Sequence, residues 1–170
     1  TLHLGGDCRY VEEPALYPYL TGKEFLEFIA QVRGLSIMTT NKWMDVFFAE
    51  FGLKTKSDEL ISNYSHGMRQ KISLAAAMIF GPKLLLLDEP MNALDPESIY
   101  QFKQRLNQMR EKGTTIIFSS HILDTVEKIC DRVAVINKGK IIVCDTVNKL
   151  KSSENNKSLE DIFMNLVVRD

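Results

Sequence analysis

The stretch KLLLLDEPMNALDP, residues 83 to 96, decides the fold of this chain. Its four leucines, Leu84 to Leu87, lie between two prolines, and the run is too short and too uniformly apolar for a surface helix. It therefore predicts a central strand of a parallel sheet, covered on both faces. Open α/β sheets bind ligands beyond the carboxyl ends of their strands, which is where Asp88 and Glu89 lie.

The chain on either side of this strand shows two kinds of pattern. Residues 15 to 80 are mainly helical in pattern, whereas strands and helices alternate after residue 81, as is typical of an α/β sheet. The expected helices begin at Thr21 (with Glu24 as a capping box), at Thr39 or Thr40, at Ser65, at Asp95, at His121 and at Ser158. The expected strands are residues 8–12, 84–87 and 114–118, with a hairpin of 133–137 and 141–144 around Lys138-Gly139.

Composition limits the classes of protein that the chain can belong to. Its 170 residues are 45% apolar, which is enough for one domain with a real core, and a formal charge of −1 gives no general case for binding nucleic acid or an anionic membrane. No signal-peptide pattern is present, and every apolar run is far shorter than the roughly 18 to 20 residues of a membrane span. Three scattered cysteines predict a reducing, cytoplasmic setting with buried thiols.

The two acids at the end of the leucine strand suit phosphate chemistry. Asp88 could orient Mg²⁺, directly or through water, because this ion prefers carboxylate and phosphate oxygens. Glu89 could orient an attacking water or accept its proton. The alternative is that both acids are only the polar start of a loop.

Three neighbouring motifs favour the first interpretation. YSHGMRQK, residues 64 to 71, places Ser65 and Gly67 at a helix N-terminus, where free N–H groups and the helix dipole attract anions. NALDP, residues 92 to 96, caps the next helix. His121 ends the motif SSH after the following strand, so we expect it beside the acids, where it could contact a phosphate. The plain alternatives are ordinary helix caps and a helix-start histidine.

In this order and spacing the motifs resemble those of the ATP-binding cassette (ABC) domain. YSHGM is similar to its signature loop, LLLLDEP to its Walker B strand, NALDP to its D-loop and His121 to its switch histidine, while the segment from Glu12 to Leu26 resembles the one following the Q-loop. The resemblance extends over nearly the whole chain. It implies an α/β fold: a parallel sheet of the P-loop NTPase type, here incomplete, with an inserted ABC helical subdomain.

The resemblance also implies four segments. Residues 1–14 are the end of the ATP-binding core up to the Q-loop, and residues 15–80 are the helical subdomain ending in the signature helix. Residues 81–150 are the remaining core with Walker B, D-loop and switch histidine, and residues 151–170 are a C-terminal tail helix.

Roles follow residue by residue from the resemblance. Glu89 would be the catalytic base or water-orienting group, Asp88 would hold Mg²⁺ through water, and His121 would contact the γ-phosphate of ATP. Asp95 would carry signals between two sites. The residues expected to contact ATP bound mainly to a second subunit are Ser65, His66, Gly67 and Met68.

Two departures from the family pattern matter. Glu12 replaces the Q-loop glutamine as a candidate Mg²⁺ ligand, with Glu13 as the alternative because the segment is a residue short. The phosphate-loop motif G-x-x-x-x-G-K-[ST] is absent from the 170 residues, since Gly22-Lys23 is followed by Glu24. We therefore expect an N-terminally truncated cassette in which Leu84 to Leu87 has an unpaired edge, and which is inactive alone.

The function implied is the ATP-binding subunit of an ABC exporter. YSHGM in place of Leu-Ser-Gly-Gly-Gln, and the ending SLEDIFMNL, are similar to cassettes that export drugs, antibiotics and ions through a separate membrane subunit. The expected partners are that permease and a second ABC subunit in a head-to-tail dimer, on the inner face of the cell membrane, with no nucleic acid. Alternatives are a non-transport regulatory or ribosome-associated factor, and a catalytically dead interaction module.

Overall fold

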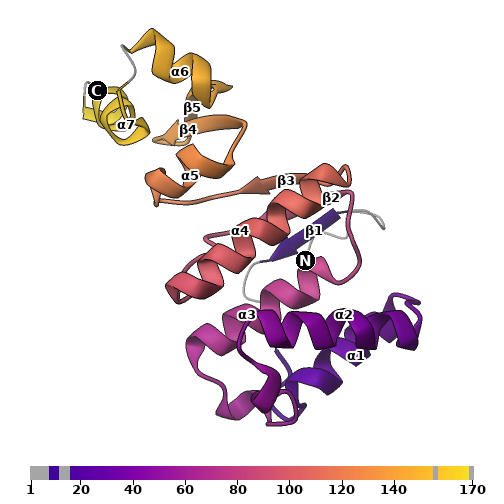
Figure 1. Ribbon diagram of the computed structural model, residues 1–170. Coiled ribbons are helices and arrows are strands. Elements are labelled where there is room, and N and C mark those ends of the chain that lie inside the picture. The colour runs from indigo at the N-terminus through magenta and orange to yellow at the C-terminus, as the bar shows by residue number, and fades with distance from the viewer. Residues whose placement is uncertain (1–7, 12–15, 155–156, 169–170) are drawn as a thin grey trace. The chain divides into compact units, whose positions relative to one another are not determined.

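The structure is a computed structural model that describes residues 8–11, 16–154 and 157–168 (Figure 1). The chain divides into two compact units, Thr1–Ser119 and Ser120–Asp170. The first contains β1 (Cys8–Val11), α1 (Gly22–Val32), α2 (Ile37–Glu50), the short 3-10 helices η1 (Lys54–Lys56) and η2 (Ile61–Asn63), α3 (His66–Met78), β2 (Leu84–Leu87), α4 (Pro96–Glu111) and β3 (Thr115–Phe118). The second contains α5 (Leu123–Ile129), β4 (Arg132–Asn137), β5 (Lys140–Thr146), α6 (Val147–Ser153) and α7 (Leu159–Val168). The sequence predicts a division of the chain after residues 14, 80 and 150, on a different basis from these two compact units. That division into four segments stays a prediction.

The first unit is built on a parallel sheet with β2 at its centre. Its strand order is β1-β2-β3, and Leu84 is opposite Cys8 on one side and Thr115 on the other. The predicted parallel α/β sheet is therefore confirmed, but the expected unpaired edge of β2 was wrong, because β1 pairs with it. Among the described residues, the outer edges of β1 and β3 have no partner strand.

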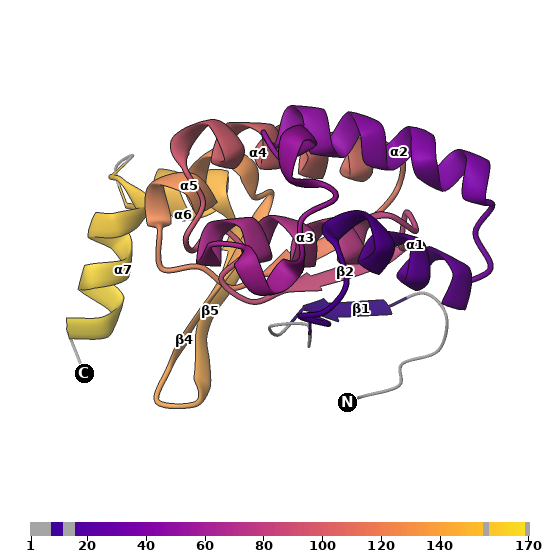
Figure 2. The ribbon, with the colours of Figure 1, turned by 90° about the horizontal axis from the view of Figure 1, so that it is seen from below.

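The two faces of this sheet are covered to different extents. Leu85 and Leu87 are buried, and Figure 2 shows α3 and α4 on one side of β1 and β2. Leu84 and Leu86 are only half-buried, and Ile117, which the register places on their face, is 58% exposed. The expectation of cover on both faces was thus wrong for the second face, which the described elements of this unit leave partly exposed.

The helices of the first unit begin mostly where the sequence predicts. Thr21 and Glu24 form the capping box of α1, with each side chain bonded to the backbone N–H of the other residue. α2 begins at Ile37 after Ser36, instead of at Thr39 or Thr40, because the Thr40 N–H already donates to the Ser36 carbonyl at 3.0 Å and so lies within the first turn. The core between α1, α2 and α3 consists of large apolar side chains such as Phe25, Leu26, Phe47 and Ile72.

The second unit contains the predicted hairpin. β4 and β5 pair antiparallel, and both turn residues are left-handed, with φ 47° at Lys138 and φ 77° at Gly139, as a two-residue hairpin turn favours. The expectation of buried thiols was wrong for Cys130 and Cys144, since neither is fully buried. Cys130 is half-buried and desolvation raises the pKa of its thiol to about 11, whereas Cys144 is exposed on the hairpin. No helix within the described parts of the chain is long and apolar enough to cross a membrane.

The unequal cover of β2 leads to a prediction for two neighbouring leucines. Leu85 is fully buried and Leu84 is not, so Leu85→Ala should lower the free energy of unfolding of the 170-residue chain by about 3 kcal/mol and Leu84→Ala by about 1 kcal/mol. Urea unfolding of both variants measures the difference. Equal losses would show that both faces of β2 are packed alike.

Candidate functional site

The candidate site lies where β2 and β3 end. Asp88 and Glu89 directly follow β2, and Ser119 directly follows β3. The Ser119 hydroxyl donates to Asp88 Oδ1 in a short hydrogen bond and accepts the Glu89 backbone N–H at 3.0 Å. The Ser119 N–H in turn donates to the Leu87 carbonyl at 3.0 Å. One serine therefore ties the Asp88 side chain and the Glu89 backbone to the neighbouring strand end.

The backbone of the acid pair is held in an uncommon conformation. Glu89 has φ 42° and Ala93 has φ 61°, in the left-handed region that residues with a Cβ seldom occupy. The Asn92 N–H donates to the Glu89 carbonyl at 3.1 Å and closes a turn directly after the acids. Such a conformation persists only where the surroundings enforce it, which is frequent at functional sites. The loop of residues 90–95 is thus a part of the site that has to be held in place.

The start of α3 is the second part of the site. Ser65 caps the helix by accepting the Met68 N–H at 3.2 Å, so that amide is already satisfied. Ser65 and His66 are exposed, and the first N–H groups of a helix have no acceptor within it. The predicted helix start is therefore exposed to solvent, as expected. The amides of His66 and Gly67 precede the Met68 amide that Ser65 caps, and they belong to the part of a helix that attracts anions.

One face of α3 packs directly against the 90–95 loop. A Cβ at Gly67 would lie 2.5 Å from the Ala93 carbonyl oxygen, so only glycine permits the observed approach. Gln70 Nε2 donates to the Pro90 carbonyl at 3.2 Å, and Lys71 Nζ lies 2.8 Å from Asp95 Oδ2. The structure thus brings the two motifs together within one chain.

Asp95 is fully engaged by its own chain. It caps α4 by accepting the Ser98 N–H and the Ser98 hydroxyl, both at 2.8 Å. The hydrogen bond from Lys71, followed by that from the Ser98 N–H, holds the pKa of the Asp95 carboxyl well below its ordinary value. This carboxylate therefore stays charged in mildly acidic solution. Its expected role in carrying signals between sites stays a prediction.

For two residues predicted for the site, the position beside the acids stays a prediction. His121 is exposed at the start of the second unit, in the segment that follows Ser119, and Glu12 lies outside the described residues. Within the described parts of the chain no three His, Cys, Asp or Glu side chains form a metal-binding group. The pair Asp88 and Glu89 still suits Mg²⁺, which is commonly held by one or two carboxylates with water and phosphate oxygens completing its shell.

Sequence reasoning missed the residues that hold the acids in place. Ser119, Gln70 and Lys71 received no role of their own, although Ser119 follows a predicted strand parallel to that of the acids. That shared position was a usable signal, because parallel strands end at the same edge of a sheet. Nothing local in the sequence indicated which loop Gln70 and Lys71 contact.

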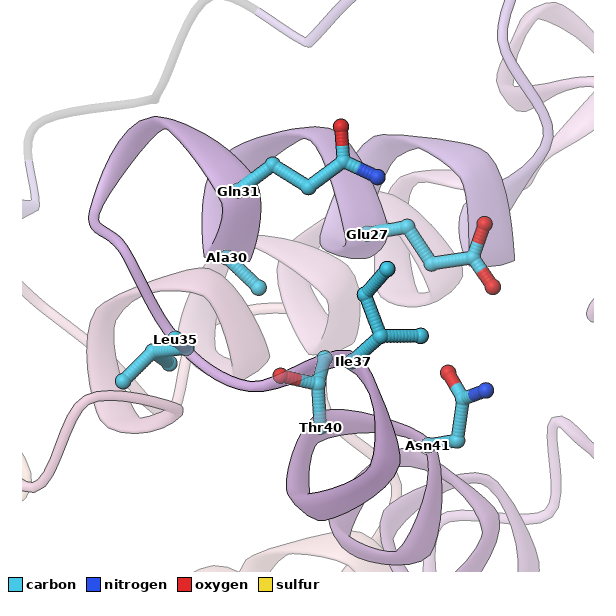
Figure 3. A pocket seen from close by; sticks show the side chains of 7 residues that line it. All are labelled: Glu27, Ala30, Gln31, Leu35, Ile37, Thr40 and Asn41. Atoms are coloured by element: carbon cyan, nitrogen blue, oxygen red, sulfur yellow. The ribbon is translucent and has the colours of Figure 1, made fainter.

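A separate hollow between α1 and α2 is a poor candidate for a nucleotide. Figure 3 shows the lining side chains, which are Glu27, Ala30, Gln31, Leu35, Ile37, Thr40 and Asn41. Its empty volume of about 170 Å³ is below the roughly 300–1,000 Å³ of small-molecule sites. Thr40 Oγ1 and Asn41 Oδ1 are buried there without a hydrogen-bond partner among the described residues. A water molecule is the ligand that such polar atoms would take.

Comparison with known proteins agrees with the motifs. The family model described as "ABC transporter" matches residues 3–92. The chain is 34% identical to the ABC transporter ATP-binding protein NatA of Bacillus subtilis, over 92% of this chain and 64% of that protein. It is 39% identical to the bacitracin transport ATP-binding protein BcrA of Enterococcus faecalis, over 78% of this chain and 42% of that protein. The chain thus spans less than two thirds of either curated relative.

A solved structure supports the same grouping. The structure titled as an ATP-binding subunit of an ABC transporter matches with a TM-score of 0.87 and 30% identity, covering 94% of this chain and 68% of the other.

The close approach of Gly67 to the loop leads to a prediction. Gly67→Ala should lower the free energy of unfolding by about 1 to 3 kcal/mol, because the new Cβ displaces the Ala93 backbone and this outweighs the gain in helix propensity. His66→Ala, in the same turn but exposed, should change it by less than about 0.5 kcal/mol. If urea unfolding gives both variants the same midpoint, the packing of α3 on the loop is not as described.

Proposed function

Because this chain belongs to the ABC transporter family, we propose that it serves as the ATP-hydrolysing subunit of an exporter whose membrane part is a separate polypeptide. Two kinds of support favour export. YSHGM and the ending SLEDIFMNL resemble cassettes of exporters, and the names of two relatives refer to bacitracin transport and to linearmycin resistance. The proposed location is the inner face of the cell membrane, against that permease.

The observation that carries the proposal is the double contact of Ser119 with the acid pair. Its hydroxyl holds Asp88 Oδ1 and the Glu89 N–H, so the Asp88 side chain and the Glu89 backbone at the end of β2 are tied to the end of β3. Acids placed in this way can orient a water molecule without first having to be ordered, and positioning is the main contribution of a protein to phosphoryl transfer.

Each residue then has a task in the proposed reaction. Mg²⁺, when bound with ATP, neutralises charge on the phosphates. Asp88 would hold that ion through water, with Glu12 as a further ligand. Glu89 orients the attacking water and accepts its proton, and His121 donates a hydrogen bond to the γ-phosphate.

A head-to-tail dimer fits the exposed start of α3. Ser65, His66, Gly67 and Met68 offer one anion-attracting helix end, whereas the 170 residues contain no phosphate-loop motif to hold a nucleotide beside it. A second ABC subunit would present the ATP, and Asp95 would connect the two sites because it lies on the loop that α3 contacts.

The shared site predicts a dimer that depends on ATP. In the whole protein, meaning the longest polypeptide that its gene encodes, Glu89→Gln should slow hydrolysis and trap a MgATP-bound dimer, because the amide cannot accept a proton. Light scattering with MgATP measures the mass, with Glu111→Gln as an exposed control that hydrolyses ATP normally. A monomer for Glu89→Gln under these conditions would contradict the shared site.

The 170-residue chain alone should not hydrolyse ATP. Gly22 and Lys23 open α1 within a capping box, so Lys23 cannot act as a phosphate-loop lysine. Calorimetry should detect no tight MgATP binding by the short chain, and a phosphate-release assay no turnover. Steady turnover that Glu89→Gln abolishes would show that the chain holds phosphates in another way.

A further inference from the structure

We propose that Lys71, assisted by Gln70, is a positioning residue for Glu89, acting through the 90–95 loop. The proposal rests on the function proposed above. Both residues end the motif YSHGMRQK, but neither is among the residues of that motif that are expected to contact ATP. Both lie on α3 and contact the loop that runs from the acids to α4.

The contacts come from one face of α3. Gly67, Gln70 and Lys71 are spaced i, i+3 and i+4, which places them together on a helix surface. They contact the loop at the Ala93 carbonyl and at Pro90 and Asp95, so the loop is held near both ends and between them. A helix face with three such contacts fixes a loop more firmly than any one of them could.

Lys71 is the strongest of these contacts. Its side chain is 12% exposed, and Nζ also donates to the Phe51 carbonyl at 3.1 Å, where α2 ends. The ammonium is therefore held from two sides and is largely withdrawn from solvent, although its partner Asp95 is 51% exposed. In the Lys56–Glu59 pair both side chains are exposed, at 46% and 42%, and the pair joins residues only three apart.

Glu89 depends on this loop for its orientation. Its backbone has φ 42° and would relax if the chain beyond it were free to move. Ser119 fixes the N–H of Glu89, Gln70 fixes the carbonyl of the next residue, and Lys71 fixes Asp95 at the far end. Lys71 touches no reacting atom, so its loss should change the rate of the chemical step and leave nucleotide binding unchanged.

The test compares Lys71→Met with Lys71→Arg in the whole protein. Lys71→Met keeps most of the side-chain volume and removes both hydrogen bonds. We expect kcat for ATP to fall by about ten- to a hundredfold, as catalysis is sensitive to displacements of about 1 Å, and KM to stay within about twofold. Lys71→Arg keeps the charge and should recover most of kcat. Lys56→Met, which removes an exposed pair, should behave as the unsubstituted protein.

A second measurement does not depend on activity. Amide hydrogen exchange of residues 89–95 should be at least about tenfold faster in Lys71→Met, but not in Lys56→Met, because the loop opens without its ion pair. Unchanged exchange, unchanged kcat, or a rise in KM alone would overturn the proposal. An unsubstituted protein without ATPase activity would refute the proposed function, and the exchange experiment would then still decide whether Lys71 holds the loop.

Gln70→Met keeps the test decisive if Lys71→Met does not fold. It removes the smaller contact with Pro90 and should lower kcat by about threefold with KM unchanged, since a neutral hydrogen bond contributes less than a charged one. A Gln70→Met protein with normal kcat and normal exchange of residues 89–95 would overturn the proposal.

Discussion

The ion pair between Lys71 and Asp95 joins three parts of the first unit. Lys71 belongs to α3, Asp95 caps α4, and the Phe51 carbonyl that shares the ammonium ends α2. The chain between Glu89 and Asp95 therefore lies between two anchored ends. The same carboxylate caps α4, so it also determines where that helix begins and where the loop before it ends.

The second constraint is electrostatic. Adjacent carboxylates at the end of an apolar strand repel each other unless donors or a cation lie near. The Ser119 hydroxyl satisfies Asp88, and the Glu89 backbone is bonded to the same oxygen. The Asp88 side chain and the Glu89 backbone are thus both held at the sheet edge by a neutral hydroxyl group. Such a site is suited to a ligand that brings its own cation.

The sequence patterns of helix caps and turns correctly predicted the features that depend on a few neighbouring residues. The capping box at Thr21, the caps at Ser65 and Asp95, and the hairpin around Gly139 are all confirmed, because each is decided within a few residues. The pairing of strands was harder to predict from the sequence. That β1 covers the far edge of Leu84–Leu87, and that one sheet face is poorly covered, depends on segments distant in sequence.

In the candidate site, too, some residues were predictable from local sequence patterns and others were not. The positions of Asp88 and Glu89 followed from a strand and its end, whereas the contacts of Gln70 and Lys71 required knowledge of which loop faces α3. The most direct test of this account is a titration of the Asp95 carboxyl by carbon NMR. Its pKa should lie well below the ordinary value of about 3.9 and return towards it in Lys71→Met. An ordinary pKa in the unsubstituted protein would mean that Lys71 does not hold the loop in solution.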